Sequence, residues 1–298
     1  MSDNKAGDQV SVSGPKATEQ AAPVVGAAKP RARVSSGLGV RITGRDLEIL
    51  EFVNDMKFAN LEMLHLRFFS RPRGGGPSKS TWWARERIQA LRSLGLVKPV
   101  RIYTEGQSYF VATDLAFHIL SSMKPERLHA KPLESIDIRS FEHDKRILYS
   151  RVALELGGRA KEWFSERRLK SEQMFEAEGR DIGREYQPDA IYTNAKGDRV
   201  AFELELSFKS RERYEKKFRT FDSLFRYDNK PLFKNCLIVA STAPMYRLLQ
   251  GVLRKTVGDS ERFRLVSFEE LVKPIGVVVP GAVARAQAEP ELELTEGQ

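Results

Sequence analysis

The sequence contains few of the residues that build disulfides and zinc sites. It has one cysteine, Cys236, and four histidines among 298 residues. A single cysteine cannot form an internal disulfide or a zinc finger, and the histidines lack the HExxH spacing of zinc proteases. Cys236 lies in the apolar run 236–240, which favours a small core residue. The composition therefore excludes a disulfide framework and a cysteine–histidine metal centre.

Long apolar segments are also absent. No run approaches the roughly 20 residues that cross a bilayer, and the N-terminus MSDNKAGDQV lacks the basic-then-apolar order of a signal peptide. We therefore expect a cytoplasmic protein without membrane insertion. Residues 1–40 and 280–298 contain few large apolar side chains, so we predict a disordered tail at each end.

Positive charge is abundant and unevenly distributed. The formal net charge is +9. The stretch from Arg67 to Arg101 contains nine basic residues and one acid, Glu86. An excess of this kind favours a polyanionic partner such as nucleic acid. A charged helix surrounded by water is the ordinary alternative, but such a helix usually mixes the two signs.

The same stretch follows the element order of a winged helix-turn-helix domain. Thr43 and Asn60 are each placed to cap a helix. A third helix is expected to start near Ser78 or Ser80 and to end at Gly95. Strand-like runs at 96–103 and 108–112 follow, joined by the turn TEGQ. Three helices followed by a hairpin predict a winged helix-turn-helix domain over 41–124.

One face of the third helix is expected to contact double-stranded DNA. Arg85, Gln89 and Arg92 share this face, which is displaced from the apolar line of Ala84, Ile88 and Leu91. A winged helix that contacts protein is the alternative. We expect the Trp–Trp pair of this helix, Trp82 and Trp83, to act as core and interface residues. The predicted DNA-binding residues are Arg71, Arg73, Lys79, Arg85, Gln89, Arg92, Lys98 and Arg101.

A second pattern begins after a linker predicted at 125–139. It has the order α-β-β-β-α-β, which makes the whole chain an α+β protein. The expected domain covers 140–279. Its expected elements are a helix from near Ser140 to Leu156, strands at 162–169, 189–193 and 199–207, a charged helix at 210–227, an apolar strand at 236–240, a helix from Pro244 and a strand at 263–268.

Three acids of this domain suggest a metal site. Strand side chains alternate between faces, so Glu203, Glu205 and Ser207 are expected to share one face. Asp189 precedes them on a neighbouring strand. Grouped carboxylates repel each other unless a cation lies between them, and Mg²⁺ or Mn²⁺ accepts such oxygen ligands. The alternative is an amphipathic edge strand whose acids lie in water.

The spacing of Pro-Asp and Glu-x-Glu in this order resembles the PD-(D/E)xK nuclease superfamily. In that superfamily a lysine usually follows at the position held here by Glu205 or, if the motif is aligned one step later with Glu205 as its acid, by Ser207. In both alignments the lysine is missing, so Lys209 or Lys217 of the next helix would have to replace it. The chain from about Thr43 to Phe268 is also similar to the replication-relaxation family of mobile elements and to MobC-type plasmid mobilization proteins. The matching stretches are RIQALRSLGLVKPV, EHDKRI, WFSERRL, QPDAIY and FELELSFKSRERYEKK.

This resemblance implies a role for one further residue, and the sequence leaves alternatives open for two others. It makes His143 a catalytic or DNA-facing residue, whereas the neighbouring Asp144 is ordinarily explained as a helix cap. Glu166 can join the acidic group from the strand expected at 162–169, or it can lie at the surface. Tyr214 can in principle attack a phosphodiester, but a packed tyrosine is the more common case.

The expected function is site-specific, metal-dependent nicking of DNA by a relaxase-like mobilization protein. Its expected partners are a plasmid transfer origin and other mobilization proteins. The candidate catalytic residues are Asp189, Glu203, Glu205, Lys209, Lys217 and His143, of which the three acids would bind Mg²⁺ or Mn²⁺. The alternative is a non-catalytic replication, transfer or transcription factor whose nuclease-like domain is inactive, and the missing motif lysine favours it.

Overall fold

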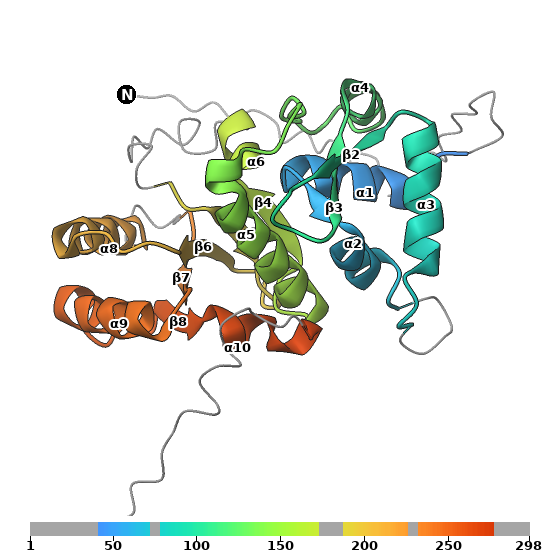
Figure 1. Ribbon diagram of the computed structural model, residues 1–298. Coiled ribbons are helices and arrows are strands. Elements are labelled where there is room, and N and C mark those ends of the chain that lie inside the picture. Colours follow the sequence, from blue (N-terminus) through green and yellow to red (C-terminus); the bar gives the residue numbers. More distant parts are fainter. Residues whose placement is uncertain (1–40, 72–77, 173–186, 226–231, 277–298) are drawn as a thin grey trace, which may run out of the picture. The chain divides into compact units, whose positions relative to one another are not determined.

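The computed structural model describes residues 41–71, 78–172, 187–225 and 232–276. The predicted tails and Arg73 lie outside the described residues. The described part of the chain is an α+β structure with two sheets (Figure 1). None of its helices is long and apolar enough to cross a membrane.

The first part of the structure surrounds a three-stranded antiparallel sheet with the order β1-β3-β2. The expected hairpin is present, and a third, two-residue strand extends it. The elements in chain order are α1 (Gly44–Asp55), β1 (Ala59–Asn60), α2 (Leu61–Phe68), α3 (Trp82–Ser93), β2 (Val97–Arg101), β3 (Ser108–Ala112) and α4 (Asp114–Met123).

Local capping determines where these helices begin. Thr43 and Asp46 form a reciprocal capping box at the start of α1, and the Asn60 side chain accepts a hydrogen bond from the backbone of Met63 in α2. The chain leaves α3 through Gly95, whose φ of 70° favours glycine. The three predicted boundary signals at Thr43, Asn60 and Gly95 are therefore confirmed.

The second part contains a mixed five-stranded sheet with the order β4-β5-β6-β7-β8. The first three strands are antiparallel, whereas β6, β7 and β8 run parallel. The elements are α5 (Ile138–Leu156), β4 (Glu162–Ser165), α6 (Glu166–Ser171), β5 (Ala190–Thr193), β6 (Arg199–Glu205), α8 (Arg211–Phe225), β7 (Asn235–Ala240), α9 (Ala243–Val257), β8 (Phe263–Ser267), α10 (Phe268–Val272) and the 3-10 turn η2 (Lys273–Ile275).

Helices cover both faces of this sheet, as Figure 1 shows. On one face, Phe202 and Leu204 pack in the same hydrophobic cluster as α5 and α10. On the other face, Ala201 and Ile238 pack in a cluster with α8 and α9. The central strand β7 is buried from both sides, which explains its continuous apolar sequence. Cys236 is buried within it, as predicted.

Two expectations about this framework were wrong, and two helices, α4 and α10, were not predicted. The strand predicted at 162–169 ends at Ser165, because the Ser165 hydroxyl caps α6 by accepting a hydrogen bond from the Arg168 backbone. Likewise, Ser267 caps α10 and ends β8. Helix α4, which Thr113 caps, was not expected. Trp82 and Trp83 are not core residues, since they are 52% and 62% exposed.

Helix α5 joins the two parts of the structure. Its Phe141 ring packs 5.3 Å from the ring of Phe58 and 5.1 Å from that of Tyr109, measured between centroids. The Asn60 amide donates a hydrogen bond to the Tyr149 hydroxyl. One hydrophobic cluster runs from α1 through α5 to the five-stranded sheet. The division into domains at 124 and 140 stays a prediction, and this shared core indicates that the two parts unfold together.

We expect Phe141→Ala to lower the free energy of unfolding by about 3–5 kcal/mol, because the substitution leaves a cavity between two aromatic rings. The loss should appear in a single denaturant transition, monitored by circular dichroism. Phe208→Ala is the matched control. That side chain is 62% exposed, so its removal should change stability by no more than about 0.5 kcal/mol. Two separate transitions, of which only one moves, would contradict the shared core.

Candidate functional site

Strand β6 carries the two glutamates of the candidate site. Leu204 between them packs toward α5, so alternation directs Glu203 and Glu205 to the α8 side of the sheet, as predicted. Both glutamates are buried, at 3% and 2% exposure. The alternative of an edge strand with its acids in water is wrong, because β6 lies between β5 and β7.

Two lysines reach these carboxylates from the following segment. In α8, Lys217 Nζ lies 2.5 Å from Glu203 Oε2 and 3.4 Å from Glu205 Oε1. Lys209 Nζ, which precedes the helix, lies 2.7 Å from Glu205 Oε2. A cation therefore does lie between the two glutamates, and it is the ammonium group of Lys217. Both lysines suggested as replacements for the missing motif lysine are thus at the site.

Asp189 and His143 complete one side of the group. Asp189 Oδ2 accepts a hydrogen bond of 2.8 Å from the backbone of Leu204 and lies 3.4 Å from His143 Nε2. The same imidazole nitrogen lies 3.3 Å from the Leu204 carbonyl oxygen. The structure therefore places His143 of α5 beside the predicted acids, although 46 positions separate it from Asp189.

These contacts fix the charge of the pair. Burial alone would lower the pKa of His143, but Asp144 and Asp189 raise it to about 10. Burial likewise opposes ionisation of Asp189, but the hydrogen bond from His143 and its charge lower the pKa of the carboxyl. The structure thus favours an imidazolium that faces a carboxylate near neutral pH, rather than a general base.

Asp144 does not cap the helix, which corrects the ordinary explanation given above. Helix α5 begins earlier, at Ile138, and its cap is Asp137. Asp144 instead accepts hydrogen bonds from Ser140 and from Lys57, whose Nζ lies 2.7 Å away. Lys57 follows α1 with a φ of 70°. The pattern could not reveal this contact, because Lys57 belongs to a distant segment.

Glu203 is the group least satisfied by its surroundings. Burial raises its pKa to about 8 even though the Lys217 charge opposes the shift. Its Oε2 atom binds Lys217, but its buried Oε1 atom has no hydrogen-bond partner among the described residues. The pKa of Lys217 is raised because both glutamate charges outweigh the effect of burial. The cluster therefore has one buried acceptor left over.

The chemistry of these acids fits a divalent cation, although their arrangement does not yet form a metal site. Asp189, Glu203 and Glu205 offer oxygen ligands, and Glu203 Oε1 is free to accept. Within the described ranges, however, no three His, Cys, Asp or Glu side chains are arranged to hold a metal ion. Lys217 would have to release Glu203 before the acids could converge on one.

Two further candidates have structural contacts instead. Tyr214 is fully buried, and its hydroxyl lies 3.2 Å from the Ser207 carbonyl oxygen, to which it donates. Burial raises its pKa to about 12, so it stays protonated. Glu166 lies in the first turn of α6, where its Oε1 pairs with Lys170 at 2.5 Å. Its Oε2 lies 3.6 Å from Lys57 Nζ, which also binds Asp144, and Glu166 borders the same small cavity as Asp144 and Asp189. Glu166 therefore lies beside Asp189 and, among the described residues, contacts neither β6 glutamate through a shared lysine.

The basic segment is divided between structural and exposed side chains. Arg67 pairs with Glu155, and Arg87 pairs with Asp46 of the α1 capping box. These two arginines attach α2 and α3 to their neighbours, a role that the charge pattern did not show. Arg71 is exposed and donates to the Leu156 carbonyl oxygen.

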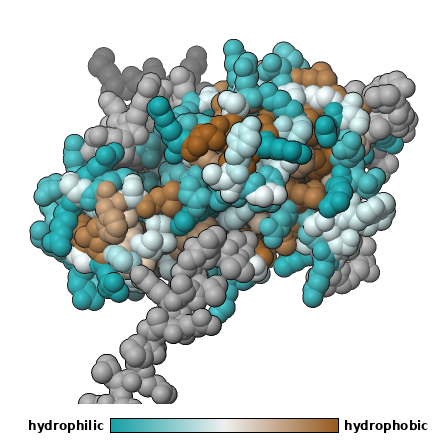
Figure 2. Space-filling view, viewed as in Figure 1, coloured by the Kyte–Doolittle hydropathy of each residue, from teal (hydrophilic) through white to brown (hydrophobic). Residues whose placement is uncertain are grey.

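The other residues predicted to bind DNA are exposed in the described part of the chain. No carboxylate of the described residues forms an ion pair with the lysines and arginines among them. Figure 2 shows that hydrophilic residues cover most of the face seen in Figure 1. Ala84, Ile88 and Leu91 are buried, and the side of α3 that carries Arg85, Gln89 and Arg92 is displaced from them, as predicted. This exposed set, called the basic face below, consists of Lys79, Arg85, Gln89, Arg92, Lys98 and Arg101.

Comparison with known proteins adds no assignment. No family model matches the chain, and neither the curated proteins nor the solved structures include a match. The function is therefore inferred from the residues of this chain and their contacts.

We expect Lys217→Met to lower the free energy of unfolding by about 3–5 kcal/mol, because it leaves two buried carboxylates without their shared cation. Adding Glu203→Gln in that background should recover part of the loss by removing one buried charge. Urea denaturation at about pH 9, above the Glu203 pKa of about 8, measures both effects. Arg219→Met is the control, since its side chain is 68% exposed in an ion pair on the same helix. Equal stability of wild type and Lys217→Met would show that the cluster is not held by this lysine.

Proposed function

We propose that this protein binds double-stranded DNA through the basic face of α3 and β2. The single observation that carries the proposal is the set of exposed basic side chains that lack acidic partners within the described residues. Ion pairs occupy Arg67 and Arg87 of the same segment, whereas the charge of the basic face is available to phosphates.

The fold around α3 supports this proposal. Helix α3 is followed directly by the β2–β3 hairpin, in which Tyr103 is fully exposed at the tip. Its 12 residues span about 18 Å, and the major groove of DNA accepts a helix. Arg87, paired with the buried Asp46, holds the helix on α1 while the opposite side stays open. We therefore interpret this part as a winged helix-turn-helix module with α3 as its recognition helix.

A second function, metal-dependent nicking of the bound DNA, is favoured by the unpartnered Oε1 atom of Glu203. Asp189, Glu203 and Glu205 would hold the ion. A bound Mg²⁺ would supply charge stabilisation at the phosphate and a more acidic water. With the ion present, Lys217 would be released to contact a phosphate oxygen, and His143 would hold Asp189 in position.

The competing proposal is a non-catalytic accessory or regulatory factor of a mobile element. It is favoured by the present partners of the glutamates, since Lys217 and Lys209 already neutralise them. Both proposals share the DNA-binding face, and they differ only in what happens at β6. The role in plasmid mobilization is part of the first proposal and follows from the resemblance described above.

DNA binding is tested by fluorescence anisotropy with a labelled duplex at several salt concentrations. Arg85→Ala and Arg92→Ala should each weaken binding by about 1–3 kcal/mol if they read bases, and by less if they touch only phosphates. Removing one side chain that binds a phosphate should reduce the slope of log affinity against log salt by about 1. Arg254→Ala, on α9 and 76% exposed, is the control. Equal effects of all three variants would show that binding depends only on the net charge of the protein and not on the position of these arginines.

The metal site is tested by thermal melting in the presence and absence of millimolar Mn²⁺. An ion that binds only the native state should raise the wild-type melting temperature. Asp189→Asn and Glu203→Gln should abolish that gain and any Mg²⁺-dependent nicking of supercoiled DNA, while duplex affinity stays unchanged. An unchanged wild-type melting temperature, together with destabilisation by Asp189→Asn, would support the non-catalytic factor.

A further inference from the structure

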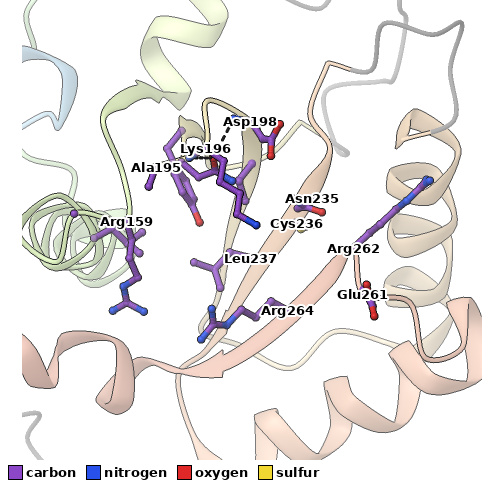
Figure 3. Close-up of a pocket in the computed structure, with 15 residues that line it drawn as sticks. Arg159, Ala195, Lys196, Asp198, Asn235, Cys236, Leu237, Glu261, Arg262 and Arg264 are labelled. Carbon is purple, nitrogen blue, oxygen red and sulfur yellow. Dashed lines mark hydrogen bonds between the residues drawn. The ribbon is translucent and has the colours of Figure 1, made fainter.

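A second site is present at the opposite end of the five-stranded sheet. A cavity of about 380 Å³ lies between the end of α5, the β5–β6 turn and the beginnings of β6, β7 and β8 (Figure 3). It borders Val200 at the start of β6, whereas Glu205 ends the same strand. Five residues of strand separate these positions by about 16 Å, so the cavity is distinct from the carboxylate cluster. Its size is within the range of small-molecule sites.

The lining combines an apolar base with converging donors. Leu154, Val200 and Leu237 supply buried apolar surface. Figure 3 shows Arg159 and Arg264 with their guanidinium groups on the same side of the opening. Tyr192 lies opposite Val200 in the sheet register, and Arg264 lies opposite Leu237. Tyr192, Val200 and Leu237 belong to one hydrophobic cluster, so Tyr192 and Arg264 share the sheet face that borders the cavity, and Arg159 lines the same cavity from the end of α5.

These donors are not satisfied by the protein. No carboxylate within the described ranges pairs with Arg159 or Arg264, and no hydrogen bond to the Tyr192 hydroxyl is formed there. Two acids also border the cavity, but neither neutralises the pair. Asp198 binds Lys234 at 2.5 Å, and Figure 3 places Glu261 beside Arg262, away from Arg159 and Arg264.

We propose that this cavity binds a phosphate monoester attached to a flat ring, with Arg159, Arg264 and Tyr192 as the phosphate-binding residues. Guanidinium groups match phosphate geometry through paired hydrogen bonds. The apolar base would accept the ring, and the Asn235 amide, which also lines the cavity, would reach its polar edge. The Asn194 Oδ1 atom already accepts hydrogen bonds from the backbones of Lys196 and Asp198, so this oxygen is not available to the ligand. A free nucleotide and the 5′-phosphorylated end of a DNA strand both carry this chemistry.

Isothermal titration calorimetry on the full chain in phosphate-free buffer tests the proposal. Thymidine 5′-monophosphate should bind, and thymidine should bind at least tenfold more weakly. Arg159→Gln and Arg264→Gln should each reduce affinity about tenfold, which is the usual effect of losing a hydrogen bond to a charged group. Arg262→Gln is the matched control, because this arginine borders the cavity but points away from it. The variant should bind the nucleotide with the same affinity as wild type.

Two further arms identify the source of the phosphate and separate this site from the basic face. A short single strand with a 5′-phosphate that binds more tightly than the nucleotide would identify a strand end, and equal or weaker binding would identify a free nucleotide. Arg85→Gln with Arg92→Gln should leave nucleotide affinity intact even where duplex binding is abolished. The proposal is overturned if the nucleotide does not bind or if thymidine binds equally well. It is also overturned if Arg85→Gln with Arg92→Gln abolishes nucleotide binding while Arg159→Gln and Arg264→Gln leave it unchanged.

Discussion

Burial of α5 on almost every side is the constraint on which the described structure depends. Ten residues of this helix between Phe141 and Leu154 are buried, and the eight from Ile147 to Leu154 are consecutive. Such a helix must be enclosed by other elements, because apolar surface all round cannot face water. Elements α1, α2 and β3 enclose one side, and the five-stranded sheet encloses the other. Arg151 and Glu155 in its last turns form an ion pair that also includes Arg67 of α2.

This constraint brings the two proposed functional regions into one contact network. Lys57, at the end of α1, binds Asp144, and the neighbouring His143 binds Asp189 at the edge of β5. The basic face is attached to the same α1 by the Arg87–Asp46 pair. A change in the position of α1 would therefore act on Asp189 through two adjacent residues of α5. The network provides a physical path between the basic face and the carboxylate cluster.

Local rules predicted much of the framework. Caps at Thr43 and Asn60, the positive φ of Gly95 and the alternation along β6 each depend on a few neighbouring residues, so the sequence contains the whole signal. The failures at Ser165 and Ser267 have the same origin. There a serine follows strand-like aromatic or β-branched residues, but its capping hydrogen bond starts a helix, and the Glu-, Arg- and Leu-rich residues after it favour that helix.

The candidate sites were less predictable because distant segments build them. The alternation of side chains along a strand predicts that the two glutamates of β6 share one face of the sheet. The position of Lys217 above them depends on how α8 packs against that face. Likewise, Arg159 and Arg264 are 105 positions apart and carry no shared motif. Their proximity arises only when β8 aligns with β7 and the turn after α5 meets the same end of the sheet.

The energetics of the carboxylate cluster argue for a role beyond stability. Replacing a buried ion pair by apolar residues of similar size is often neutral or stabilising, so burial of three charges on one sheet face is a poor way to hold a fold together. Here the arrangement also leaves Glu203 Oε1 without a partner among the described residues, at a cost of about 1–3 kcal/mol. A group maintained at such a cost is more readily explained by something that it binds. A cation that displaced Lys217 would satisfy this oxygen and would convert the lysine from a structural partner into a free positive charge beside the site.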